Sequence, residues 1–122
     1  MPVVPVISII DDDPSVRAAT YNLLRSFGYV VHSFDSAEAF LQSPQFAETS
    51  CAIVDVRMPG MSGLEMQAHL RAQGYGVPLI FVTAVPDASA RGRALAAGAS
   101  GFLTKPFNKD TLIDCIDTAL GR

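Results

Sequence analysis

A small set of side chains has the residue types and spacing needed to hold a hard cation and an anion together. They are Asp11, Asp12, Asp13, Asp55, Thr83 and Lys105. Mg²⁺ prefers oxygen ligands and commonly bridges one or two carboxylates to a phosphate. Lysine acts as a point charge on phosphate oxygens, and an aspartate among such groups can attack phosphorus to become an aspartyl phosphate. The set predicts phosphoryl chemistry assisted by Mg²⁺ or Mn²⁺.

Each of these residues also has a structural explanation when it is taken alone. Asp55 would then be a solvated loop carboxylate, and the acidic triplet would be a helix cap with solvated charges. Thr83 would mark the end of a strand, and Lys105 would be a surface cation. The joint pattern favours function, because all of these residues would fall at the same end of successive strands, where open parallel sheets bind their ligands.

The stretch 51–60 organises the chain. It is apolar from Ala52 to Val54, carries one carboxylate at Asp55 and breaks at Pro59-Gly60. A run of small and β-branched residues without polar alternation is typical of a strand buried on both faces. A charge inside such a strand would be costly, so Asp55 is expected at the carboxyl edge of the sheet.

The rest of the chain alternates between strand and helix patterns. The expected strands are 3–10, 29–34, the run that ends at Asp55, 79–83 and 101–104; the expected helices are 14–26, 35–41, 63–74, 87–97 and 108–120. Asp13 and Asp87 are predicted N-caps, and capping boxes are predicted at 35–38 and 62–65. A polar loop is expected up to Ser50. Strict alternation with short connections predicts a parallel sheet covered on both faces.

Composition narrows the class of protein. The 122 residues suit one domain, 1–122, and the net charge of −3 gives no electrostatic argument for nucleic-acid binding. No apolar run is long enough for a membrane span, and no secretory signal is recognised at the start. Cys51 and Cys115 fall in apolar segments, as expected of reduced core residues in a cytoplasmic protein.

Four motifs together resemble the receiver domain of two-component response regulators. They are Ile10-Asp11-Asp12-Asp13, Val54-Asp55-Val56-Arg57-Met58-Pro59, Thr83-Ala84 and Leu103-Thr104-Lys105-Pro106-Phe107. The resemblance covers essentially the whole chain. It implies an α/β, flavodoxin-like (βα)5 three-layer sandwich with a five-stranded parallel sheet in the order 2-1-3-4-5. It also implies a signalling domain, not an enzyme, that accepts a phosphoryl group from a sensor histidine kinase.

The resemblance also assigns the metal and acceptor residues. Asp55 would be the phosphorylation site, and Asp12, supported by Asp11, would hold Mg²⁺. The main-chain carbonyl of Arg57 would complete the protein ligands, and Asp13 fits better as a helix cap.

The remaining assignments concern the phosphoryl group and the switch. Thr83 and Lys105 would contact the phosphoryl group, and the small side chain of Ala84 would leave the acceptor accessible. Phe102 occupies the position of an aromatic switch residue. The bond before Pro106 is expected to be cis.

Segments 32–38 and 57–63 are similar to receivers of the nitrogen-fixation regulator subfamily, which usually precede a helix-turn-helix DNA-binding domain. The chain is therefore either a stand-alone receiver, acting by protein contact or in a phosphorelay, or a piece of a longer regulator of transcription. The residues do not decide between these, and this domain itself is not expected to bind DNA. Phosphorylation is expected to produce a homodimer through the fourth helix, fifth strand and fifth helix.

Two other functions were weighed. A phosphohydrolase of the haloacid-dehalogenase type needs a second acid two residues after its nucleophile, where this chain has Arg57. A pseudo-receiver should lack the acidic pair, the acceptor or the lysine, and all three are present. The Arg57 side chain is expected to reach carboxylates of the empty pocket, Arg17 is expected to be a solvated helix charge, and the 87–97 helix, with Leu95 as its one large apolar residue, is expected to be weakly held.

Overall fold

The computed structural model describes residues 4–121, which form a five-stranded parallel sheet. The strands are β1 (Val6–Ile10), β2 (Val30–Phe34), β3 (Cys51–Asp55), β4 (Leu79–Thr83) and β5 (Gly101–Thr104). Their order across the sheet is β2-β1-β3-β4-β5, which confirms the predicted flavodoxin-like topology. The predicted start of the first strand at Val3 lies outside the described residues.

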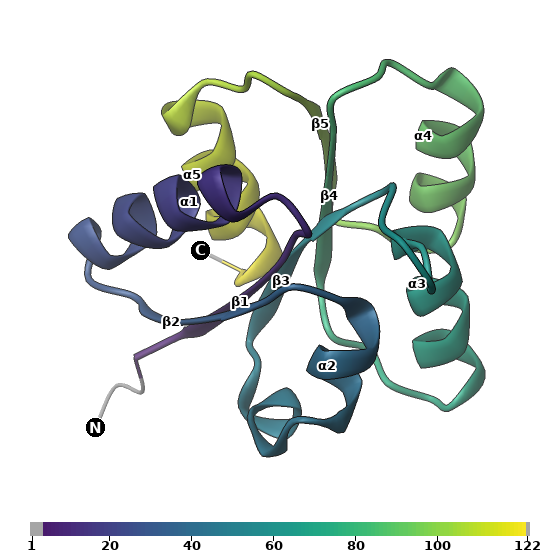
Figure 1. The fold of residues 1–122 in the computed structure, drawn as a ribbon, viewed down its shortest axis with the longest axis horizontal. Coiled ribbons are helices and arrows are strands. Elements are labelled where there is room, and N and C mark those ends of the chain that lie inside the picture. Colours follow the sequence, from purple (N-terminus) through teal and green to yellow (C-terminus); the bar gives the residue numbers. More distant parts are fainter. Residues whose placement is uncertain (1–3, 122) are drawn as a thin grey trace.

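Helices cover both faces of this sheet. They are α1 (Pro14–Ser26), α2 (Ala37–Gln42), α3 (Gly63–Ala72), α4 (Ala88–Ala96) and α5 (Lys109–Ala119), with a 3₁₀ turn η1 (Pro44–Glu48) after α2. Figure 1 shows α1 and α5 on one face and α2, α3 and α4 on the other, which gives the three predicted layers. Within residues 4–121, no helix has the length and apolar character needed to cross a membrane.

Each face of the sheet has its own apolar core. Neighbouring residues of one strand point to opposite faces, so Ile53 packs with α1 and α5 while Val54 packs with α2, α3 and α4. All five residues of β3 and all five of β4 are buried, which explains why their sequences lack polar alternation. The first carboxylate along β3 is therefore its last residue, Asp55.

The helix starts follow the predicted caps, with one exception. Asp13, Ser62 and Asp87 cap α1, α3 and α4, and Ser62 forms the predicted capping box with Glu65.

The predicted capping box at 35–38 is wrong. The hydroxyl of Ser36 caps α2 by accepting the amide hydrogen of Ala39 at 3.0 Å. The Glu38 carboxylate instead accepts the amide hydrogen of Met61, at 3.0 Å, in the loop that follows β3.

The predicted polar loop before Ser50 is also wrong for residues 44–48. The Phe46 ring packs edge-on against Phe40, with ring centroids 5.2 Å apart, and against Tyr75 at 5.1 Å. Edge-to-face pairs of this kind add stability beyond their buried area, so the aromatic contacts draw the segment into η1.

Candidate functional site

Asp55 ends β3 at the carboxyl edge of the sheet, as predicted. Its side chain is 10% exposed, so both oxygens depend on protein partners. Oδ1 accepts the amide hydrogen of Arg57 at 3.1 Å, and Oδ2 lies 3.1 Å from Nζ of Lys105. These contacts hold the carboxylate between the loop after β3 and the end of β5.

The β1–α1 loop brings the acidic residues beside Asp55. Asp11 is buried, and its Oδ1 accepts the amide hydrogen of Asp13 at 2.9 Å; Asp12 is exposed. Arg17 does not act as a solvated helix charge, because its guanidinium donates to the main-chain oxygen of Asp11 at 2.7 Å. That bond ties the acidic loop to the first turn of α1, a role that the sequence did not reveal.

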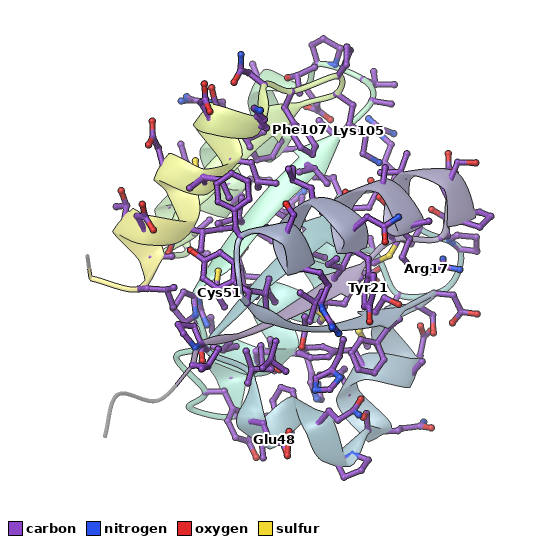
Figure 2. The ribbon with its side chains drawn as sticks, turned by 90° about the vertical axis from the view of Figure 1, so that its left-hand side faces the viewer. Arg17, Tyr21, Glu48, Cys51, Lys105 and Phe107 are labelled. Carbon is purple, nitrogen blue, oxygen red and sulfur yellow. The ribbon has the colours of Figure 1, made fainter. Side chains whose placement is uncertain are left out.

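Lys105 lies between the two buried carboxylates. Its Nζ is 2.9 Å from Oδ2 of Asp11 and 3.1 Å from Oδ2 of Asp55, and its own side chain is 15% exposed. The peptide bond from Lys105 to Pro106 is cis, as expected, and the Lys105 amide donates to the carbonyl of Thr83 at 2.7 Å. Figure 2 shows Lys105 and Phe107 lying beside α1 on the face that α1 and α5 cover.

Burial sets the electrostatics of this crevice. It raises the pKa of the Asp55 carboxyl above its ordinary value, and the Arg57 amide and Lys105 oppose that rise without cancelling it. Burial alone would lower the pKa of the Lys105 ammonium, but its hydrogen bonds and charge contacts with Asp11 and Asp55 raise it overall. The lysine therefore stays charged at neutral pH and offsets part of the acidic charge.

The carboxylates are close enough to share a cation. One oxygen from each of Asp11, Asp12 and Asp55 lies within 4.8 Å of the others. Three carboxylate oxygens at the mouth of a crevice suit a hard divalent ion that retains several waters. The donor set therefore fits Mg²⁺ or Mn²⁺.

The remaining predicted residues line the same edge. The Thr83 hydroxyl is buried and turned toward its own loop, where it donates to the Val85 carbonyl at 3.1 Å and accepts from the Val85 amide at 3.3 Å. Ala84 is exposed, and the half-buried Phe102 packs against Phe81 with ring centroids 6.3 Å apart. The structure thus brings Thr83 and Ala84 to the crevice, whereas Phe102 lies on β5, three residues before Lys105, and packs against Phe81.

The expected position of the Arg57 side chain is wrong. Its guanidinium does not reach the pocket carboxylates, because Nη2 pairs with Oδ2 of Asp87 at 3.1 Å. Asp87 is the N-cap of α4, so this contact joins the loop after β3 to the start of the fourth helix.

Two further residues hold the loop after β3. A Cβ atom at Gly63 would lie 2.5 Å from the main-chain oxygen of Asp55, so only glycine lets α3 begin this close to β3. Glu38 reaches the same loop from α2 through the Met61 amide. The sequence shows Gly63 as a helix-start residue, but the backbone contact that requires glycine is visible only in three dimensions.

Fold and site together define a flavodoxin-like α/β domain with an acidic crevice and a lysine at the carboxyl edge of its sheet. The sequence model of the response regulator receiver domain family matches residues 7–117 of this chain. The chain belongs to the response regulator receiver domain family, and it is a receiver domain of the two-component type.

Similar proteins include regulators of transcription. The response regulator protein TodT of Pseudomonas putida is 43% identical over 115 residues, covering 94% of this chain and 51% of TodT. The transcriptional regulatory protein FixJ of Azorhizobium caulinodans is 39% identical over 116 residues, covering 95% of this chain and 55% of FixJ. FixJ-like nitrogen-fixation regulators are thus among the relatives, as the wording of segments 32–38 and 57–63 indicated.

A solved structure gives the same result for the fold. The response regulator StyR superposes with a TM-score of 0.90 at 44% identity, covering 98% of this chain and 60% of StyR. The chain spans about half the length of the curated relatives it matches.

Proposed function

We propose that this receiver domain accepts a phosphoryl group on Asp55 from a sensor histidine kinase. The observation that carries the proposal is the position of Lys105, whose ammonium bridges Asp55 and Asp11 at the edge of the sheet. In the transfer, Oδ of Asp55 forms a bond to phosphorus while the phosphorus–nitrogen bond of the phosphohistidine breaks. The imidazole of the donor leaves with the electron pair and takes up a proton from solvent.

The acidic cluster would hold the divalent cation that this transfer needs. Asp12 and Asp55 would be its ligands, with Asp11 in support and the main-chain carbonyl of Arg57 as a further oxygen. When bound, the cation offsets negative charge on the phosphoryl oxygens. Asp11 would keep its contact with Lys105, because the Asp11 carboxylate is more buried than that of Asp55.

Lys105 and Thr83 would stabilise the other phosphoryl oxygens. The ammonium of Lys105 already lies at the acceptor oxygen, so it needs little movement to contact the incoming group. The Thr83 hydroxyl would turn from the Val85 backbone toward the phosphoryl group. Ala84 leaves the entrance open, and the space that Thr83 vacates would become available to Phe102.

An apolar groove beside the site suits the phosphoryl donor. It has a volume of about 490 Å³ and lies between α1 and the segment after β5. Its lining is Val16, Ala19, Thr20, Leu23, Ala84, Lys105, Pro106 and Phe107. Because the groove contains both Lys105 and Ala84, a helix of the kinase seated in it would present its phosphohistidine to Asp55; Figure 2 shows this face.

Phosphorylation would produce a homodimer through the surface formed by α4, β5 and α5. This dimer would be the signalling output of the domain. Leu95 of α4 is 38% exposed, and Val85, in the loop that precedes α4, is 52% exposed. As in the relatives, the downstream effect would be control of transcription by a segment other than this domain; a stand-alone receiver that acts by protein contact is the alternative. The proposal implies a cytoplasmic location, where a histidine kinase draws on ATP.

Phosphorylation of Asp55 can be tested first with a small-molecule donor. Incubation with acetyl phosphate and Mg²⁺ should add one phosphoryl group per chain by intact mass, and Asp55→Asn should remain unlabelled. Labelling of Asp55→Asn to the wild-type level would refute the assignment of the acceptor.

The groove can be tested in the same assay. Leu23→Lys should slow transfer from the histidine kinase while leaving labelling by acetyl phosphate unchanged, because the small donor needs no docking surface. Leu95→Lys, on the opposite face of the sheet, is the matched control and should transfer normally. Equal loss with both donors would mean that Leu23 supports the fold and not the docking of the kinase.

A further inference from the structure

The fourth helix is held by polar contacts more than by apolar packing. Its buried residues are two alanines, Ala90 and Ala94, so it anchors no large side chain in the core. The buried Gln67 of α3 donates to the carbonyl of Ala94 at 3.0 Å. Arg71 of α3 donates to the carbonyl of Ala97 at 3.3 Å. These two bonds fasten the C-terminal half of α4 to α3.

The first turn of α4 has a different attachment. The Asp87 carboxylate caps the helix through Oδ1, which accepts the amide hydrogen of Ala90 at 3.0 Å, and pairs through Oδ2 with Arg57 at 3.1 Å. Arg57 lies two residues after the acceptor, and its amide is bonded to Asp55. One carboxylate therefore fixes the start of the helix and joins it to the acceptor loop.

The two attachments differ in how easily they can be released. The Gln67 bond is buried, whereas the Arg57 side chain is 61% exposed and that of Asp87 is 29% exposed. Exposed ion pairs contribute little and are screened by salt. The attachment beside the acceptor is thus the weaker one, so α4 can pivot about its C-terminal half.

We propose that Arg57 is a positioning residue for α4, holding its first turn in the unphosphorylated state through the ion pair with Asp87. Both residues of the pair line a groove of about 560 Å³ between the loop after β3 and α4. Opening the pair lets the first turn of α4 shift along this groove.

A short connection through Thr83 and Val85 links Asp55 to the Arg57–Asp87 ion pair. This step rests on the proposed function. The Thr83 hydroxyl holds Val85 by two bonds, and Val85 lies two residues before Asp87. A Thr83 hydroxyl turned toward a phosphoryl group gives up both bonds. The segment that aligns Asp87 with Arg57 then loses its support, and the ion pair opens.

Amide hydrogen exchange of the unphosphorylated chain tests the pair without any phosphate chemistry. Asp87→Asn keeps the helix cap and removes the charge, and Arg57→Gln removes the partner. Each should raise exchange of the Ala90 and Arg91 amides about two- to fivefold. The double variant should exchange no faster than Asp87→Asn alone, and the amides after Ala94 should stay unchanged.

Asp13→Asn is the matched control, because Asp13 caps α1 and makes no ion pair among the described residues. It measures the effect of removing a cap charge alone, and its effect on α1 should be smaller than that of Asp87→Asn on α4. Wild-type exchange in Arg57→Gln, or effects of the two single variants that multiply in the double variant, would overturn the proposal.

A second measurement tests release. Beryllofluoride with Mg²⁺ should raise exchange of the wild-type first turn to the Asp87→Asn value, with little change in the variants. Intact mass after acetyl phosphate treatment reports acceptance by Asp55 separately. A chain that is labelled at Asp55 yet keeps its first-turn exchange would overturn the release of the pair and leave the proposed function standing.

Discussion

The contact between the start of α3 and the end of β3 can be tested by adding one methyl group to Gly63. A Cβ atom placed on Gly63 would lie 2.5 Å from the main-chain oxygen of Asp55 and 3.1 Å from side-chain atoms of Val54 and Phe81. Backbone oxygen at that distance cannot move aside as a flexible side chain can. Gly63→Ala should therefore push the start of α3 away from β3 and tilt the Asp55 carboxylate from Lys105.

The magnitude follows from a matched substitution elsewhere in the protein. Gly92 lies within α4, and a Cβ atom there would meet nothing within 4 Å. Gly92→Ala should stabilise the protein by about 0.5–1 kcal/mol, the usual helical preference for alanine. Gly63→Ala gains the same preference but suffers overpacking of about 2–3 kcal/mol, the upper part of the usual range because a backbone oxygen cannot move aside, so it should lose about 1–2.5 kcal/mol overall.

Thermal unfolding in metal-free buffer separates the two outcomes. For a domain of 122 residues, each 1 kcal/mol corresponds to a shift of about 4 °C in Tm. The two variants differ by the overpacking alone, so their Tm values should differ by roughly 8–12 °C with wild type between them. Phosphorylation of Gly63→Ala by acetyl phosphate should also slow, while Gly92→Ala should keep the wild-type rate. A Gly63→Ala protein as stable as wild type would refute the argument from the backbone contact.

Three further predictions concern the charges of the crevice. Because the folded-state pKa of Asp55 is raised, its carboxyl contributes stability below its ordinary pKa of 3.8, and that contribution is lost as pH rises through the folded-state pKa. Asp55→Asn should therefore be more stable than wild type at pH 7 without metal, and the gap should narrow toward pH 4; a gap that is constant with pH would contradict this. Lys105→Met should cost about 3 kcal/mol in urea unfolding without metal, since it leaves Asp11 and Asp55 unpaired, and saturating Mg²⁺ should recover part of the loss. In a thermal-shift assay, Mg²⁺ at about 100 times its Kd should stabilise wild type by about 2.7 kcal/mol. Asp12→Ala should lose most of that gain, and an undiminished shift would remove Asp12 from the metal site.

The fold was predictable because local signals agreed with one another. Asp13 before Pro14 marks a helix start, and the structure has that cap and that first residue. The unbroken apolar run of β3 predicted a strand buried on both faces, which the structure confirms. Once the carboxyl ends of β1, β3, β4 and β5 lie at one edge, the acidic loop, Asp55, Thr83 and Lys105 must lie near one another.

Apart from the backbone contact at Gly63, the missed contacts of the site depend on side chains that reach between elements. Glu38 has the spacing of a capping-box acid, yet its carboxylate accepts from the Met61 amide, 23 residues away, because the loop after β3 lies beside α2. Arg57 pairs with Asp87, 30 residues further along the chain, for the same kind of reason. A long side chain can reach several partners, and only the packed structure decides which of them it contacts.

The charges of the crevice also indicate what a bound cation would contribute to the proposed reaction. Asp11, Asp12 and Asp55 bring three negative charges, and Lys105 returns one positive charge, so the crevice has a formal charge of −2. A phosphoryl group approaching Asp55 adds further negative charge at short range, where a partly buried site screens repulsion poorly. Lys105 cannot offset this alone, because its ammonium is already shared between two carboxylates. A cation held by Asp12 and Asp55 would supply the missing positive charge, and Lys105 would then be free to leave Asp55 for the incoming oxygens while Asp11 keeps it in place.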